Sequence, residues 1–274
     1  MVRIGIKPHQ LGATLSQLRL AWREAEEAGF ESVWVFDHVN RVNEQPCLEA
    51  LGLLSALACQ ISRMRLGVLV INPGLRHPAY VAGVAATVDQ LSNGRMELGV
   101  GAGSPFGMLD LAACGLPTPS LRERVALLDE YCQVLRRLWT GEKVDFAGRY
   151  FQLRGAHMGA QPVQRELPLI VGGGSRRAME VAARHATEWN LSTADPDEFR
   201  RRSGEFDELT QETGRPVAKS VQLNLRGVPD RDLEIAVQRC VDAGAERVIL
   251  VLEPPYYEGS ITTLGRRVLG SPIG

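Results

Sequence analysis

The sequence has few lysines and no excess of charge of either sign. Lysine occurs only at Lys7, Lys143 and Lys219, and the 31 Lys and Arg residues balance 32 Asp and Glu residues, for a formal net charge of -1. No run of like charges gathers them into a patch. Because binding to nucleic acid or to an anionic membrane needs a basic surface, we expect neither as a partner.

Long hydrophobic runs and cysteine patterns are also missing. The longest apolar stretches, near Ala50–Cys59 and Val248–Leu252, fall short of the ~20 residues that cross a bilayer, and the first residues lack the features of a secretory signal. The five cysteines are scattered and show no spacing of zinc ligands. We therefore expect a cytoplasmic protein with free thiols and no metal site.

Short apolar segments alternate with amphipathic helices eight times along the chain. Most of these segments are continuous apolar runs such as RVILVL, which is typical of parallel strands buried on both faces. The predicted strands are Arg3–Lys7, Ser32–Phe36, Arg65–Val70, Met96–Gly101, Pro168–Gly172, Glu188–Ser192, Ser220–Leu225 and Arg247–Leu252.

Helix signals support the same alternation. Ser120-x-x-Glu123 is a capping box, and Asp195-Pro196 places an N-cap before a proline at the first helical position. No linker or change in composition divides the chain. Eight β/α units in a chain of this length predict an α/β fold, a (β/α)8 TIM barrel that forms a single domain over residues 1–274.

Two regions interrupt the predicted alternation of strands and helices. Between the fourth helix and the fifth strand, Lys143–Pro168 includes VDFAGRYFQL and predicts a small insertion of a hairpin and loop. Ser104–Pro119 is predicted to be a long loop after the fourth strand. Together with Glu253–Ser260, these segments are expected to shape the substrate pocket.

In a (β/α)8 barrel the active site lies at the C-terminal ends of the strands. There Gly172-Gly173-Gly174-Ser175 leads into a helix that carries Arg176 and Arg177, so backbone amides, a helix N-terminus and guanidinium groups are available to one phosphate. An ordinary glycine turn with Ser175 as its N-cap explains the same residues equally well. The spacing matches neither a dinucleotide-binding fingerprint nor a Walker loop.

Two further strand ends carry candidate site residues. Asp37-His38 follows the apolar strand ESVWVF, and adjacent ionisable groups there are hard to explain as core. Because imidazole titrates near neutral pH, His38 is the candidate general acid or base, although a surface pair without a role remains the alternative. The Gly101-x-Gly103 turn lets the backbone approach a flat group, or is simply a tight turn.

Taken together, five segments resemble the luciferase-like monooxygenase family, which includes bacterial luciferase and oxidoreductases that depend on coenzyme F420. The resemblance covers roughly Val2 to Thr193 in order and is fainter beyond. The segments are EEAGFESVWVFDH, RLGVLVINPGLRHP, AATVDQLSNGRMELGVGAGS, LRRLWTGEKVDFAGRYFQL and PLIVGGGSRRAMEVAARHATEWN.

The resemblance implies a (β/α)8 barrel that holds coenzyme F420, or alternatively reduced FMN, at the C-terminal strand ends. It also implies a bulge with a non-proline cis peptide at Leu69-Val70 against the central ring, with His38 as the catalytic residue. The expected cofactor-binding residues are Asp37, Leu69, Val70, Asn72, Gly101, Gly103, Ser104, Gly172, Gly173, Gly174, Ser175, Ser192 and Thr193.

The chain departs from the family pattern after the G-x-G turn. Some dehydrogenases of the family have a glutamate there as proton donor, and this chain has Ser104, followed by Pro105-Phe106 where many relatives have a tryptophan nearby. The departure argues against dehydrogenation of a sugar phosphate. We therefore expect hydride transfer between F420 and a small organic substrate, with His38 delivering or removing the proton.

Two alternatives remain open on the sequence. The first is an FMN-dependent monooxygenase that uses reduced flavin and oxygen. The second is a protein that binds a flavin or deazaflavin without turnover. Relatives in the family are commonly dimers, so a homodimer is expected.

Overall fold

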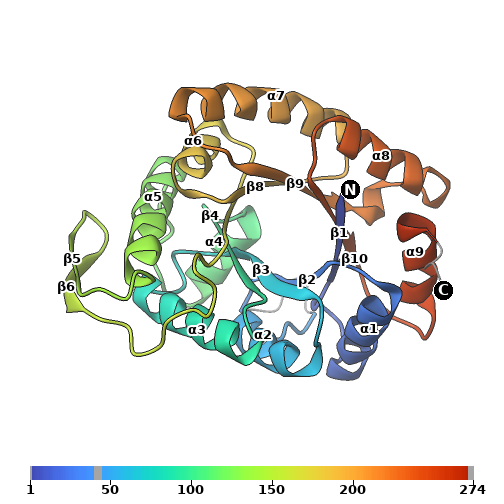
Figure 1. Cartoon of the computed structure of the whole chain (residues 1–274), viewed down its shortest axis with the longest axis horizontal. Helices are drawn as coiled ribbons and strands as arrows, with labels where there is room; N and C mark the ends of the chain where they lie inside the picture. Colours follow the sequence, from blue (N-terminus) through green and yellow to red (C-terminus); the bar gives the residue numbers. More distant parts are fainter. Residues whose placement is uncertain (1, 40–44, 271–274) are drawn as a thin grey trace.

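The computed structural model describes residues 2–39 and 45–270, and at its centre eight parallel strands form a closed barrel (Figure 1). Around the barrel the strands follow the order β1-β10-β9-β8-β7-β4-β3-β2. They are β1 (Arg3–Pro8), β2 (Ser32–Val35), β3 (Arg65–Ile71), β4 (Met96–Gly101), β7 (Leu169–Gly172), β8 (Glu188–Thr193), β9 (Ala218–Asn224) and β10 (Arg247–Leu252). The predicted (β/α)8 barrel is confirmed, and its strand ends differ from the prediction by at most two residues.

Helices surround the barrel and cover its outer face (Figure 1). The predicted capping box closes the start of α5, where the Ser120 side chain and the Glu123 side chain each accept a backbone N–H. None of the helices in the described part of the chain is long and apolar enough to cross a membrane. The helices are α1 (Leu15–Ala28), α2 (Ala50–Gln60), α3 (Pro78–Leu91), α4 (Pro105–Ala113), α5 (Leu121–Leu138), α6 (Arg176–His185), α7 (Pro196–Thr213), α8 (Leu233–Asp242) and α9 (Ser260–Leu269).

Of the two predictions for regions that interrupt the β/α repeat, one is confirmed and the other is wrong. The predicted hairpin is present as the antiparallel pair β5 (Val144–Ala147) and β6 (Gln152–Ala156), which lies outside the barrel between α5 and β7 (Figure 1). The prediction of a long loop over Ser104–Pro119 is wrong, because Pro105–Ala113 forms α4. Ser104 caps this helix with its hydroxyl, and Pro105 occupies the first turn, where proline's missing N–H costs no hydrogen bond.

The barrel interior is filled by a large aromatic side chain near its centre. Trp34 on β2 is fully buried and packs with Leu69, Ile170 and Ile249 from three other strands. A Cβ atom on Gly67 of β3 would lie 2.4 Å from the Trp34 ring. Glycine at this position therefore leaves room for the indole inside the barrel.

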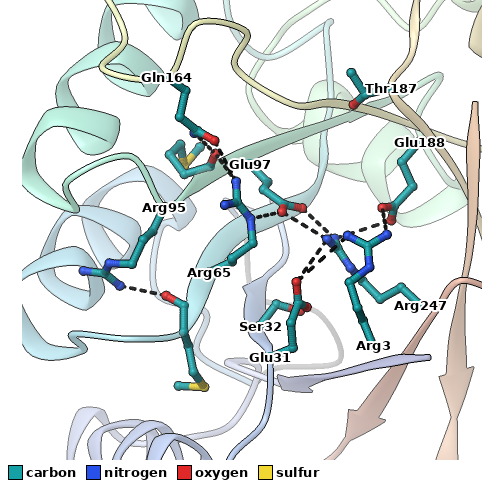
Figure 2. A network of polar contacts seen from close by, with 12 residues as sticks. Arg3, Glu31, Ser32, Arg65, Arg95, Glu97, Gln164, Thr187, Glu188 and Arg247 are labelled. Carbon is teal, nitrogen blue, oxygen red and sulfur yellow. Dashed lines mark hydrogen bonds and ion pairs between the residues drawn. The ribbon is translucent and has the colours of Figure 1, made fainter. Parts of the chain in front are cut away.

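The N-terminal end of the barrel is closed by a network of charged side chains (Figure 2). Arg247 on β10 donates to both carboxylate oxygens of Glu97, at 2.5 and 3.0 Å, and lies 3.4 Å from Glu188. Arg65 donates to the same Glu97, and Arg3 donates to Glu188 at 3.3 Å. The guanidinium and carboxylate groups compensate one another's charge at this end.

Candidate active site at the C-terminal end of the barrel

Two adjoining cavities lie at the C-terminal ends of the strands. The first, of about 260 Å³, is lined by residues of β1, β3, β8 and β9 and of the segments that follow β2 and β4, among them Lys7, His38 and Gln222. The second, of about 350 Å³, continues along the ends of β4, β7 and β8 to the glycine turn before α6. Val70 lines both cavities, so the β3 bulge lies at their junction.

The bulge in β3 has the backbone expected from the sequence. The pairing of β3 with β4 shifts register between Val68 and Ile71, and the Leu69-Val70 peptide is cis. Neighbouring glycines make room for Val70, because a Cβ on Gly101 would lie 2.7 Å from its side chain and one on Gly172 would lie 2.9 Å from it. The glycines at these strand ends therefore fit against the bulge.

His38 forms a tight pair with a residue that the sequence analysis did not identify. Its Nδ1 lies 2.6 Å from Oδ2 of Asp110 on α4, and Asp110 is 1% exposed. A carboxylate at this distance accepts the Nδ1 proton and fixes the imidazole with Nε2 as its second nitrogen. The pair can therefore hold or release a proton at the wall of the cavity.

Asp37 serves a different purpose from its neighbour His38. Its buried carboxylate accepts two hydrogen bonds from Arg76, at 2.7 and 2.6 Å, and one from the backbone N–H of Asn72 at 3.0 Å. Burial raises the pKa of Asp37, and Arg76 opposes that rise. Although Asp37 lines the first cavity, its hydrogen bonds anchor the end of β3 to the end of β2.

Three more of the predicted residues line the cavities while making internal contacts. Asn72 donates from its side chain to the Gly107 carbonyl at 3.3 Å. The Ser104 hydroxyl accepts the Gly107 N–H at 3.1 Å, so it caps α4 at the position where a glutamate was missing. Gly103 has a φ of 81°, a conformation that favours glycine.

The glycine turn before α6 has the geometry of a strand-to-helix turn with space beside it. Gly173 has a φ of 141°, and Ser175 caps α6 by accepting the N–H of Ala178 at 3.3 Å. Gly172, Gly173, Gly174 and Ser175 all line the second cavity, as does Ser192. The turn therefore presents backbone groups and a helix N-terminus to that cavity.

The Thr193 side chain, predicted as a cofactor contact, forms hydrogen bonds to the start of the next helix. Its hydroxyl donates to Glu198 at 2.6 Å and accepts the N–H of Asp195 at 3.0 Å. These bonds hold the start of α7. We therefore expect Thr193 to support α7, and its contact with the cofactor stays a prediction that substitution tests.

The floor of the first cavity holds polar residues that the sequence analysis did not assign. The Lys7 Nζ donates to the Leu69 carbonyl at 2.5 Å and to Gln222 Oε1 at 2.7 Å, and Gln222 donates to Asn190 at 2.6 Å. Burial lowers the pKa of Lys7 to about 7. A lysine inside the apolar strand RIGIKP was the signal for this site, and the sequence analysis did not use it.

A third cavity, of about 510 Å³, opens from His9, Phe36 and His38 toward Arg226 and Glu253. His9 stacks on Phe36 with their ring centroids 4.2 Å apart, and its burial, together with Lys7 and His38, lowers the pKa of His9 to about 4. His9 is therefore uncharged at neutral pH. This cavity gives a small molecule a route to His38 that is separate from the glycine turn.

Comparisons with known sequences agree with this architecture. Residues 1–245 match the family described as luciferase-like monooxygenase. The chain is 32% identical over 82% of its length to the F420-dependent glucose-6-phosphate dehydrogenase of Amycolatopsis mediterranei and 34% identical over 82% to that of Beutenbergia cavernae. The matched regions span 65% and 64% of those two relatives.

Solved structures share the fold at low sequence identity. An F420-dependent secondary alcohol dehydrogenase in complex with an F420-acetone adduct aligns with a TM-score of 0.88 and 19% identity, over 98% of each chain. A coenzyme F420-dependent tetrahydromethanopterin reductase from Methanopyrus kandleri aligns with a TM-score of 0.84 and 19% identity, also over 98% of each chain. From the family match and the barrel together, we conclude that the chain belongs to the luciferase-like monooxygenase family.

Proposed function

We propose that this chain is an oxidoreductase that transfers a hydride between coenzyme F420 and a small organic substrate. The observation that carries the proposal is the His38–Asp110 pair at the wall of a cavity that continues past the β3 bulge to the glycine turn of α6. The names of the sequence relatives and of the two structural neighbours, all F420-dependent enzymes, support F420 as the cofactor.

The residues present fit a phosphate-bearing cofactor with a planar ring. Gly172, Gly173, Gly174 and Ser175 would hold the phosphate, because backbone groups at a helix N-terminus favour an anion and Gly173 adopts a conformation that favours glycine. Ser192 would lie beside them. The residues that would border the ring are Asp37, Leu69, Val70, Asn72, Gly101, Gly103 and Ser104.

The chemistry divides between the cofactor and the protein. When bound, F420 supplies a ring carbon that accepts or donates a hydride. His38 takes the proton from a substrate hydroxyl at Nε2, or returns it in the reverse direction, while Asp110 accepts the Nδ1 hydrogen and stabilises the imidazolium. The walls of the cavity orient the substrate and limit its contact with water.

The third cavity favours an uncharged substrate. Among its described lining residues Arg226 is the cation, and it lies 3.5 Å from Glu253, so the pair offers little net charge to a phosphate. His9 is uncharged at neutral pH because its pKa is lowered to about 4. We therefore propose a small alcohol or carbonyl compound as substrate, and not a sugar phosphate.

The test compares cofactors and reactions side by side. Calorimetry on ligand-free protein should show tighter binding of F420 than of FMN, and F420 should turn over with alcohols but not with glucose 6-phosphate. Preference for FMN with oxygen consumption would replace the proposal with a flavin monooxygenase. Binding of F420 without turnover on any substrate would leave a non-catalytic binding protein.

Three further expectations from the sequence stay predictions. They are one domain over residues 1–274, a homodimer and a cytoplasmic location. Light scattering of the purified chain tests the second, since a single species of twice the chain's 30.0 kDa is expected.

A further inference from the structure

Lys7 is a buried cation at the floor of the first cavity that the proposed chemistry does not use. The residue is 6% exposed, and its Nζ is held by the Leu69 carbonyl and by Gln222. Among the described residues, no carboxylate forms an ion pair with it. A buried ammonium group without a counter-charge is costly, so its place beside a cavity needs a reason.

The groups around Lys7 do not supply the missing negative charge. Directly after β1, His9 is uncharged at neutral pH. At the end of β2, Asp37 is already bound to Arg76, and His38 is bound to Asp110. The elements on the other sides present the neutral side chain of Gln222 from β9 and the Leu69 carbonyl from β3.

The two hydrogen bonds of Lys7 leave room for one more partner. An ammonium group has three donors, and Leu69 and Gln222 take two of them. Lys7 lines the same cavity as Val70, at the bulge that would face the ring of the cofactor. The remaining position on Nζ is therefore available to an anionic group in the cavity.

Hydride transfer creates such a group. Oxidation of an alcohol removes a hydride from carbon and a proton from oxygen. The hydride would add one negative charge to its acceptor, and the proton would pass to His38 Nε2. A cation that lines the cavity holding the acceptor would interact more strongly with the reduced form than with the oxidised form.

We propose that Lys7 is an anion-recognition site on the cavity floor, which binds the negatively charged, reduced form of the cofactor ring in preference to the oxidised form. The proposal rests on the proposed function. It also implies that binding of reduced F420 is accompanied by proton uptake above neutral pH, because burial lowers the pKa of Lys7 to about 7 in the free protein and a bound anion raises that pKa.

The experiment measures dissociation constants for oxidised and reduced F420 under anaerobic conditions, in the wild type and three variants. Lys7→Met removes the charge and the hydrogen bonds, whereas Lys7→Gln removes the charge and keeps a donor for the Leu69 carbonyl. Lys143→Met is the control, because Lys143 is exposed beside the outer hairpin. Circular dichroism establishes that each variant is folded.

The wild type and Lys143→Met should bind reduced F420 more tightly than oxidised F420. Both Lys7 variants should bind reduced F420 about tenfold more weakly than the wild type does, while their affinity for oxidised F420 changes little. Calorimetry at pH 8 in buffers of different ionisation enthalpy should show proton uptake that both Lys7 variants lack. Unchanged affinity ratios in both variants would overturn the proposal and leave the proposed function standing.

Two other outcomes are equally decisive. If Lys7→Gln keeps the preference for reduced F420 and Lys7→Met loses it, the hydrogen bond to Leu69 is what matters, and the charge-based proposal is wrong. If the wild type binds neither form of F420, the proposed function fails and the assignment of Lys7 fails with it.

Discussion

The two ends of the barrel both bury charged side chains, but they treat the charge differently. At the N-terminal end, Arg247 pairs with Glu97, Glu188 and Glu31 (Figure 2). Arg65 also pairs with Glu97, and Arg3 also pairs with Glu188 and Glu31. At the C-terminal end, Lys7 meets a carbonyl and an amide oxygen instead of a carboxylate. The N-terminal network compensates its buried charges, whereas Lys7, unlike Asp37 at the same end of the barrel, has only neutral hydrogen-bond partners among the described residues.

The pKa shifts of Glu97 and Lys7 follow this difference, whereas burial raises the pKa of Glu188 in the N-terminal network against the opposing effect of Arg247. Burial acts to raise the pKa of Glu97, but Arg247 and Arg65 outweigh burial and lower it. Burial lowers the pKa of Lys7 to about 7, and no neighbouring charge opposes the shift. Removing one partner of a compensated buried pair destabilises a protein, whereas an uncompensated titratable group beside a cavity is typical of a functional site.

The largest expected effect is on turnover at the C-terminal end. His38→Ala should lower the rate with F420 by about 10²–10⁴-fold and leave F420 affinity within about threefold, because the variant loses the proton-transfer group. Steady-state kinetics and calorimetry measure the two quantities. His185→Ala is the matched control, since His185 also pairs with an aspartate, Asp129 at 3.0 Å, but on the outer helices.

Wild-type turnover in His38→Ala would remove His38 from the mechanism. A comparable loss in His185→Ala would show that removing any His–Asp pair disturbs the barrel.

The next effect is on stability at the N-terminal end. Arg247→Met should lower the free energy of unfolding by about 3–5 kcal/mol, because it leaves Glu97 and Glu188 buried without their shared cation. Urea denaturation measures the change. Arg267→Met, which removes exposed pairs to Asp230 and Glu234, should have a much smaller effect. Equal losses of unfolding free energy in Arg247→Met and Arg267→Met would contradict a stabilising role of Arg247 in the buried network.

Replacing Lys7 should raise the free energy of unfolding, in contrast to Arg247→Met, which should lower it. The pKa of Lys7 falls from 10.5 in the unfolded chain to about 7 in the folded protein, so the unfolded state binds more protons between these values and wild-type stability gains from rising pH there. Near pH 7, folding therefore carries almost the full free-energy cost of burying the Lys7 amine. Lys7→Met should therefore be more stable by about 2 kcal/mol near pH 7, with the difference shrinking toward pH 9.

Urea denaturation of wild type and variant at pH 7, 8 and 9 measures this trend. A variant that is less stable than the wild type at pH 7 would show that the hydrogen bonds of Lys7 outweigh the cost of its burial.

The smallest effect separates helix capping from cofactor binding. Thr193→Val should lower the free energy of unfolding by about 1 kcal/mol, because it removes the bonds to Glu198 and to the Asp195 N–H. F420 affinity should stay at the wild-type value in calorimetry. A tenfold loss of affinity would return Thr193 to the cofactor site.

Local sequence patterns predicted the barrel, and the family resemblance predicted the backbone of β3 at its C-terminal end. Continuous apolar strands and helix caps are local signals, and the resemblance placed the cis peptide at Leu69-Val70, where the structure has it. Asp110 was missed because its helix is short and was read as a loop, and because its pairing with His38 spans 72 residues of sequence. Contacts of this kind depend on tertiary packing and leave no periodic pattern in the sequence.

The measurement that tests the central claim most directly follows deuterium from substrate to cofactor. Wild-type protein is incubated with F420 and a panel of alcohols deuterated at the hydroxyl-bearing carbon, and with reduced, ring-deuterated F420 and a panel of aldehydes, ketones and activated alkenes. Mass spectrometry of both partners should show a single deuterium transferred directly between them. No transfer in either direction, with a substrate oxygenated in the presence of reduced FMN and oxygen, would contradict hydride transfer to or from F420 in this barrel.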